Sequence, residues 1–252
     1  GGFSFISTAT TNNLTLVNTM TLAAGAHTIT VTSPQVTATI SGQITGGTNL
    51  TKAGAGTLVL SSATTNNYGG STTVSGGVLQ LGLAAVIPDA SALIVAAGAA
   101  FDLNGKAETL GSLAGDTATT GGMITNSVTG TSATLTIGAD NTSTTYAGIL
   151  TDTKAGVATT GNLLLTKTGT GLQTLTGRNT YSGATTIGGT AGGLQIQNTS
   201  SSNTFATLGN TAITVGSEFP TVKLKLLASR TESSLDAATV VDSLKSALAD
   251  LH

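Results

Sequence analysis

The acidic side chains are the first place to look for catalysis in this sequence, and they are scattered along it. Polysaccharide hydrolases and lyases need converging carboxylates with a base, or acids that hold a metal. The acids before residue 217 are Asp89, Asp102, Glu108, Asp116, Asp140 and Asp152, and no two of them are close in sequence. Acids placed singly in turns are usually solvated, so we predict no catalytic carboxylate pair.

The two histidines, His27 and His252, lie near opposite ends of the chain. A Ser-His-Asp triad would have to use His27, yet no Gly-x-Ser-x-Gly turn leads into a helix. The sequence has no cysteine, which excludes thiolate metal sites and leaves little for zinc. We therefore predict that the protein is not an enzyme, with no catalytic residue, no metal site and no cofactor.

Two lysines and two tyrosines recur at matching places. Lys52 and Lys167 each precede a Gly-x-Gly string, where a long side chain can cover the adjacent turn of the chain. Tyr68 and Tyr181 each precede a glycine turn. We interpret all four as packing residues, and we keep Tyr68 and Tyr181 as candidate glycan contacts because an exposed tyrosine can stack on a sugar.

The composition predicts an all-β protein with many short strands and tight turns. Charged residues make up 8% of the chain, against about 25% in typical globular proteins. Threonine and valine favour strands, while the 34 glycines and the many asparagines favour turns. The mean hydropathy of +0.29 and the net charge of −2 indicate a folded chain rather than a disordered one.

Charge is distributed unevenly. Residues 1–88 contain one formally charged side chain, Lys52. The lack of clustered Lys and Arg argues against a nucleic-acid partner, and no apolar run reaches the length of a membrane helix. A surface with so little charge does not repel copies of itself, which leaves self-association open.

The strands have to come from short segments that alternate with period two. Residues 27–31, 37–40 and 133–137 are examples, each bounded by turn residues. Many short strands suit either an antiparallel sandwich or a solenoid. We keep the sandwich as the alternative.

An internal repeat favours the solenoid. The two copies cover about residues 47–105 and 162–226, and each contains several strand-turn units. In the alignment of the copies Lys52, Gly54, Gly56, Tyr68 and Leu79 match Lys167, Gly169, Gly171, Tyr181 and Leu194. We predict one β-solenoid domain over residues 1–230, with roughly nine to eleven coils of about 20–25 residues.

Residues 231–252 differ from the rest. Ala237, Val241, Leu244, Leu248 and Leu251 fall on one face of a helix. We predict a short amphipathic α-helix that caps the solenoid, or that docks on another molecule.

The repeat resembles a known family. The pattern Leu50-Thr51-Lys52-x-Gly54-x-Gly56-Thr57-Leu58-x-Leu60, followed by Asn67-Tyr68-x-Gly70-x-Thr72-Thr73-Val74, is similar to the autotransporter-associated β-strand repeat. The second copy carries the same pattern from Lys167 to Ile196. The resemblance implies a right-handed parallel β-helix, export to the cell surface or the extracellular space, and a role as stalk, adhesin or wall-like material.

Our leading functional hypothesis is a secreted structural solenoid that associates with copies of itself into a fibre or surface coat. The alternative is an adhesin or glycan-binding stalk, or a passenger fragment of an autotransporter-like surface protein. The apolar segment with Phe3, Phe5 and Ile6 is the candidate for self-association, since a neighbouring subunit could pair with it. In the other interpretation residues 1–11 fold over their own solenoid end as a cap.

Overall fold

The computed structural model of the chain is all-β in the residues that it describes. It describes residues 2–5, 13–154, 157–158, 161–188, 192–196, 207–208 and 213–215, and the side chains of residues 13–152, 161–188 and 192–196. Every regular element within these residues is a β-strand, and none of them belongs to a helix that could span a membrane.

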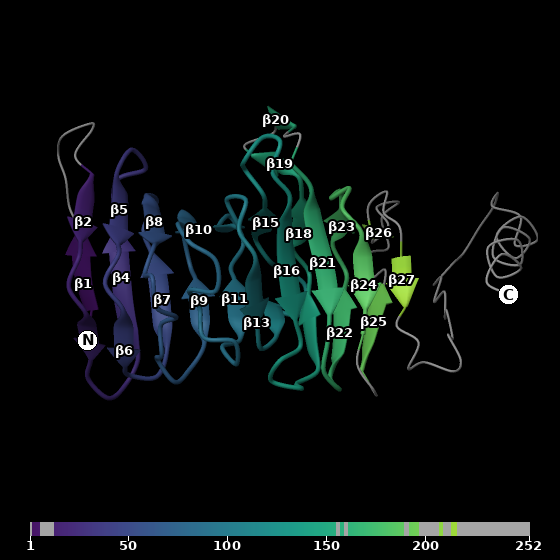
Figure 1. Cartoon of the computed structure of the whole chain (residues 1–252), viewed down its shortest axis with the longest axis horizontal. Coiled ribbons are helices and arrows are strands. Elements are labelled where there is room, and N and C mark those ends of the chain that lie inside the picture. The colour runs from purple at the N-terminus through teal and green to yellow at the C-terminus, as the bar shows by residue number, and fades with distance from the viewer. Residues whose placement is uncertain are drawn as a thin grey trace, which may run out of the picture.

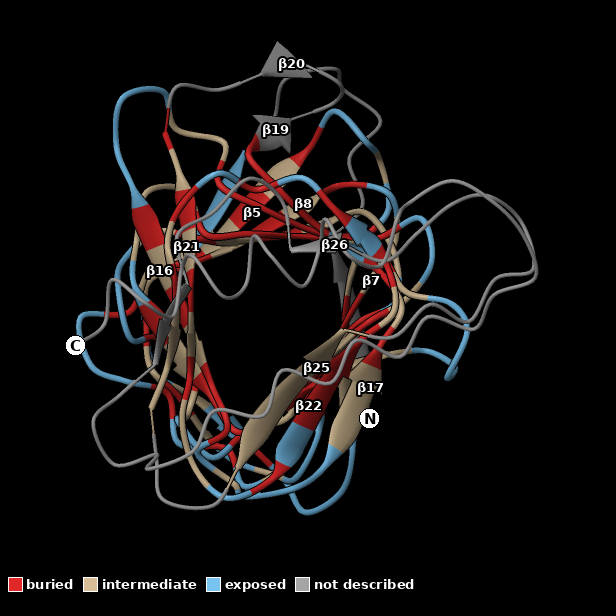
Figure 2. Cartoon of the chain, turned by 90° about the vertical axis from the view of Figure 1, so that its right-hand side faces the viewer, coloured by how far each residue is buried: buried red, intermediate tan, exposed pale blue. Residues whose placement is uncertain are grey.

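The strands stack along the long axis of the molecule in three walls (Figures 1 and 2). Wall A consists of β1 (Gly2–Phe5), β4 (His27–Val31), β7 (Leu50–Ala53), β9 (Thr72–Val74), β11 (Leu93–Val95), β14 (Leu113–Gly115), β17 (Thr144–Tyr146), β22 (Leu172–Leu175) and β25 (Gly193–Ile196). Wall B consists of β2 (Leu14–Leu16), β5 (Thr37–Ile40), β8 (Thr57–Leu60), β10 (Val78–Leu81), β12 (Ala100–Asp102), β15 (Met123–Thr125), β18 (Ile149–Thr151), β23 (Arg178–Asn179) and β26 (Thr207–Leu208).

Wall C has the same direction of stacking but fewer strands. It consists of β3 (Met20–Leu22), β6 (Ile44–Gly46), β13 (Glu108–Leu110), β16 (Ala133–Ile137), β21 (Leu163–Lys167), β24 (Thr185–Ile187) and β27 (Ile213–Val215). Between β6 and β13 the chain passes wall C twice without a named strand, apart from one parallel bridge at Thr45 and Asn67.

The pairing is parallel on every wall, so the predicted β-solenoid is confirmed. Each strand pairs with the strand one coil later, as β5 does with β8 and β8 with β10. The antiparallel pairing among the described strands is confined to β19 (Thr153–Lys154) and β20 (Val157–Ala158), which form a small hairpin at the edge of the coils (Figure 1). The sandwich alternative is therefore wrong, because sequential strands lie on different walls.

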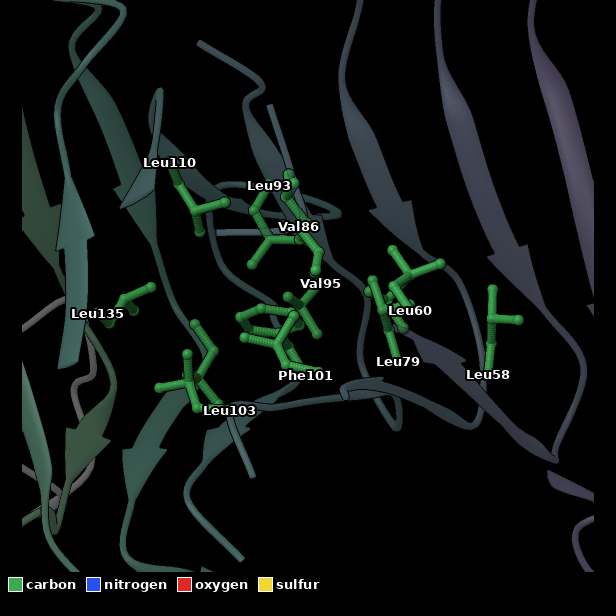
Figure 3. Close-up of a cluster of buried hydrophobic side chains, with 14 of the residues drawn as sticks. Leu58, Leu60, Leu79, Val86, Leu93, Val95, Phe101, Leu103, Leu110 and Leu135 are labelled. Atoms are coloured by element: carbon green, nitrogen blue, oxygen red, sulfur yellow. The ribbon is translucent and has the colours of Figure 1, made fainter. Parts of the chain in front are cut away.

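Like positions lie above one another through the core. On wall B the residues opposite each other in successive coils are Ala38, Leu58, Leu79, Phe101, Ile124 and Leu150, and all are buried. Figure 3 shows Leu58, Leu79 and Phe101 among the side chains that fill the interior, and Figure 2 shows buried residues lining all three walls. Burying these apolar side chains supplies the main stabilising free energy.

The described residues form about eight turns, which is fewer than the nine to eleven coils that we expected over residues 1–230. The early coils match the predicted length, since Leu93 pairs with Leu113. Later coils are longer, because Ala133 pairs with Leu163 and Thr144 with Gln173. These coils have longer loops at their corners, so the same number of residues makes fewer turns.

Tight corners join the walls. The corner after β7 places Gly54 at φ +79°, and the corner after β21 places Gly169 at φ +66°. Side chains rarely adopt such left-handed backbone angles, and glycine adopts them without strain. The recurring glycines of the repeat are therefore corner residues.

Two predictions of the fold concern residues beyond the described part. The amphipathic helix over residues 231–252 lies outside the described residues, as does most of the last part of the second repeat copy. The handedness of the coiling stays a prediction from the family resemblance.

Candidate functional site

Most acids of the solenoid hold its corners together. Asp102 is 1% exposed, and its carboxylate accepts hydrogen bonds from Gln80 Nε2 at 2.7 Å, from Asn104 N at 2.9 Å and from Ser127 Oγ at 2.6 Å. Asp152 accepts from Leu163 N at 2.6 Å and from both N and Oγ of Ser182. Each of these carboxylates ties together residues from different coils.

Glu108 is the described acid with the most unusual chemistry. The residue is 2% exposed, and its carboxylate oxygens accept hydrogen bonds from the backbone N–H groups of Val86, Ile87 and Thr109 at 3.0, 3.3 and 3.2 Å. Burial raises its pKa from 4.5 to about 7, the three hydrogen bonds oppose the shift, and the negative charge of Asp89 adds to it. A pKa near neutrality suits a general acid, but a carboxyl group this deeply buried has no access to a substrate.

The structure shows what His27 contacts and which side chains are grouped closely enough to hold a metal ion. His27 lies in β4, and its Nε2 is 2.8 Å from the carbonyl oxygen of Ala23. The described side chains contain no group of three or more His, Asp or Glu that could hold a metal ion.

The recurring lysines point into the corners. Lys52 is 1% exposed, and its Nζ donates hydrogen bonds to the carbonyl oxygens of Ala53, Gly54 and Gly76 at 2.9, 2.8 and 2.9 Å. Burial lowers its pKa to about 8, while the carbonyl oxygens favour the charged form.

Lys167 repeats this arrangement in the second copy. Its Nζ donates to the carbonyl oxygens of Thr168 and Gly169, and burial lowers its pKa while the charge of Asp140 opposes the shift. The packing interpretation of Lys52 and Lys167 is therefore correct, with one addition. Each ammonium also satisfies the carbonyl groups of the corner that it covers.

The recurring tyrosines are buried and offer no face to a sugar. Tyr68 is 2% exposed and Tyr181 is fully buried. The hydroxyl of Tyr68 is 2.6 Å from Thr72 Oγ1, and that of Tyr181 is 2.7 Å from Thr185 Oγ1. Because sugar stacking needs an accessible ring, the structure removes both residues as candidate glycan contacts and assigns them to corner packing.

The candidate self-association segment begins the solenoid. Phe3 and Phe5 belong to β1, which pairs with β4 of the same chain so that Phe3 lies opposite Ile29 and Phe5 opposite Val31. Ile6 lies outside the described residues. The strand is thus part of its own first coil, and its pairing with another subunit stays a prediction.

Side-chain amides were missed by the sequence reasoning, and they carry much of the polar structure. Asn66 accepts a hydrogen bond from Ile44 N at 2.6 Å and donates to Val86 O at 2.7 Å. Together with Glu108 it continues the ladder of wall C where named strands are missing. Asn179, its counterpart in the second copy, accepts from Leu150 N at 2.9 Å. The signal was present, since an asparagine stands two residues before the tyrosine in both copies.

Comparison with known proteins places these corners in a family. The passenger-associated-transport-repeat matches residues 50–81 and 165–196. The adhesin BmaC autotransporter of Brucella suis biovar 1 (strain 1330) is 39% identical over 183 residues. That match covers 71% of this chain and 5% of the relative. No solved structure matches the chain.

The matched segments contain both lysine corners and both buried tyrosines, so the family pattern and the structural repeat describe the same unit. The resemblance to autotransporter repeats is thereby confirmed, and the chain carries two copies of the passenger-associated-transport-repeat.

Proposed function

We propose that this chain is a structural segment of an exported bacterial passenger protein, and that it forms a rigid, non-catalytic stalk at the cell surface. The observation that carries the proposal is the parallel stacking along all three walls, in which each coil is bonded to the next. Such a rod keeps a fixed spacing along its axis, which is what a stalk requires.

The comparison supports the same setting. The relative is described as an adhesin and an autotransporter, and this chain spans about 5% of its length. A segment of that size within a much longer surface protein suits a spacer. We therefore propose secretion or surface display for this chain, with adhesion as a property of the longer protein.

The polar side chains support a role without catalysis. Asp102, Glu108 and Asp152 are buried and bonded to backbone or side-chain donors of neighbouring coils. Groups committed to holding coils together are poorly placed to exchange protons with a substrate.

Three measurements test the stalk and its non-catalytic role. Small-angle scattering of the purified chain should give a rod, and an antibody raised against the chain should label intact cells of the source bacterium. Labelling that needs permeabilised cells would contradict surface display. Release of reducing ends from a panel of polysaccharides would contradict the non-catalytic role.

Self-association is a second candidate, and one observation favours it. The described residues from 13 to 88 contain a single formally charged side chain, Lys52, and that side chain is buried. The outer surface of the early coils therefore carries no charged side chain. Three partly exposed threonines, Thr28, Thr51 and Thr73, lie opposite one another in successive coils of wall A. A neutral, regular sheet face has little electrostatic protection against a second copy.

A charge placed on that face tests self-association. We expect the scattering mass of the unmodified chain to rise with concentration, and the variant Thr51→Lys to stay monomeric. Thr166→Lys is the matched control, since Thr166 is a partly exposed threonine on wall C in the second copy. A monomeric unmodified chain at every concentration would contradict the idea.

A further inference from the structure

A single Asn–Gly pair occurs in the sequence, Asn104–Gly105, and the structure places it in a tight turn between β12 and β13. Asn104 has φ +48° and Gly105 has φ +73°, and Lys106 N donates to Leu103 O at 2.8 Å. Two successive left-handed residues form the turn that Asn–Gly favours. The same pair is chemically labile in a flexible chain, because a glycine nitrogen is unhindered and can attack the asparagine side chain.

The reacting groups of this pair are held by two different coils. The leaving amide, Asn104 Nδ2, donates to Leu81 O of the preceding coil at 2.8 Å. The nucleophile, Gly105 N, donates to Asn126 Oδ1 of the following coil at 2.8 Å. Asn126 is itself fully buried and donates to Thr131 O at 2.6 Å. A Cβ at Gly105 would lie only 3.1 Å from Thr131 Cγ2, so the following coil also covers the turn.

We propose that Asn104–Gly105 is a latent deamidation site, which the wound solenoid keeps unreactive and which reacts when the neighbouring coils separate. In the opened chain the Gly105 nitrogen loses its proton to water and bonds to Asn104 Cγ. The Cγ–Nδ2 bond breaks, and ammonia leaves with protons taken from water. A second water then opens the succinimide ring at either carbonyl and yields aspartate or isoaspartate.

The product does not fit the wound coil. A carboxylate at this position has no hydrogen to donate to Leu81 O, and it adds a second negative charge to a turn whose backbone N–H at residue 104 already donates to the buried carboxylate of Asp102 at 2.9 Å. An isoaspartate link also lengthens the backbone of a turn that is closed by one hydrogen bond. The reaction therefore makes a local opening irreversible, so a coil that opens and deamidates does not rewind.

Peptide mapping by mass spectrometry tests the proposal on the unmodified chain. The chain is incubated at mildly alkaline pH, folded in one arm and in denaturant in the other, and deamidation is measured at Asn104. Because the folded chain must open locally before it reacts, we expect a rate at least about a hundredfold lower in the folded arm. Equal rates in the two arms, or no reaction of the denatured chain, would overturn the proposal.

Hydrogen exchange gives a second readout that needs no variant. At rising denaturant below the unfolding transition, deamidation and exchange of the Gly105 amide should accelerate by the same factor, since one opening exposes both groups. Deamidation that accelerates without exchange at Gly105 contradicts the mechanism.

A matched pair of variants tests whether the deamidated product destabilises the coil. Asn104→Asp should lower the melting temperature more than Asn104→Gly, which keeps the turn and lacks the carboxylate. An equal or smaller loss for Asn104→Asp would overturn the claim of irreversibility.

Discussion

The two repeat copies have the same corner chemistry, yet they lie on different walls of the solenoid. In the first copy β7 and β9 are on wall A, and β8 and β10 are on wall B. In the second copy β21 and β24 are on wall C, and β22 and β25 are on wall A. The second copy is therefore turned by one wall about the long axis.

The difference shows what the repeat encodes. Between Lys52 and Lys167 the chain does not complete a whole number of turns, so the copies do not stack over each other. Each copy still forms a lysine-filled corner followed by a buried tyrosine. The repeat specifies a corner and the coil that stacks on it, and the three similar walls let this unit begin on any of them.

The corners also differ in detail. Lys52 donates to three carbonyl groups, one of which, Gly76 O, belongs to the next coil. Lys167 donates to two carbonyl groups of its own corner and lies in the field of Asp140. Replacing the lysine should therefore destabilise the first corner more than the second. Both corners still need a glycine at positive φ.

The largest expected effect comes from replacing the corner glycines, Gly54 and Gly169, which both corners need. A Cβ on Gly54 would meet Val31 O of the preceding coil, and one on Gly169 would meet Gly138 O. We expect Gly54→Ala and Gly169→Ala each to lower the free energy of unfolding by about 3 kcal/mol or more, since a backbone clash adds to the strain of positive φ. Chemical denaturation followed by circular dichroism measures the loss.

Gly98 is the matched control for these variants. It has φ +78°, but a Cβ there would have nothing within 4 Å. Gly98→Ala should therefore cost only the strain of the left-handed backbone, about 1 kcal/mol. If Gly169→Ala cost as little as Gly98→Ala, the two corners would not be equivalent.

The corner glycines also show how far the sequence alone reaches. The alignment of Gly54 with Gly169 and of Tyr68 with Tyr181 predicted the solenoid and the packing role, because repeats with matching turn residues stack. Sequence could not show that the tyrosines are buried, since the same residue before a glycine turn can point inward or outward. It also missed the buried, hydrogen-bonded roles of Asn66 and Glu108, because their partners lie one coil away and are brought close only by the winding.

The next effect is a pH dependence that belongs to the coil stacked on the first copy. The folded chain holds the Glu108 proton more tightly than the unfolded chain, because burial raises the pKa from 4.5 to about 7. Stability from this group is therefore full below pH 4.5, falls as the pH rises to about 7, and is level above that. The loss is of the order of 3 kcal/mol.

The variant Glu108→Gln isolates the contribution of Glu108 to the pH dependence of stability. The amide keeps an acceptor for the N–H groups of Val86 and Ile87 and does not ionise. Denaturation curves recorded across the window should show a smaller pH slope for the variant than for the unmodified chain. An unchanged slope would assign the dependence to other groups.

Removing the corner lysines has the third-largest expected effect, and its size should differ between the two repeat copies. Lys52→Met keeps the apolar stem and leaves three carbonyl groups without their charged donor, so we expect a loss of about 2–3 kcal/mol. Lys167→Met leaves two and should cost about 1–2 kcal/mol. Residue-resolved hydrogen exchange reads each corner separately. A larger loss at Lys167 would reverse the ranking of the two corners.

The smallest expected effect concerns the tyrosine hydroxyls, which are alike in the two copies. Tyr68→Phe removes a hydrogen bond to Thr72, which keeps Ser91 Oγ as a partner at 2.9 Å. Tyr181→Phe removes the matching bond to Thr185. Because one neutral hydrogen bond is lost and the ring still fills its place, each variant should lose about 1 kcal/mol, measured by thermal unfolding. Tyr146→Phe is a control outside the repeat, since that hydroxyl donates to Gly122 O at 2.8 Å.

A glycan array should give the same result for all three tyrosine variants as for the unmodified chain, because these rings are inside the coils. Loss of a glycan signal in Tyr68→Phe or Tyr181→Phe alone would show that a repeat corner opens to bind sugar, and it would break the equivalence of packing that the two copies display.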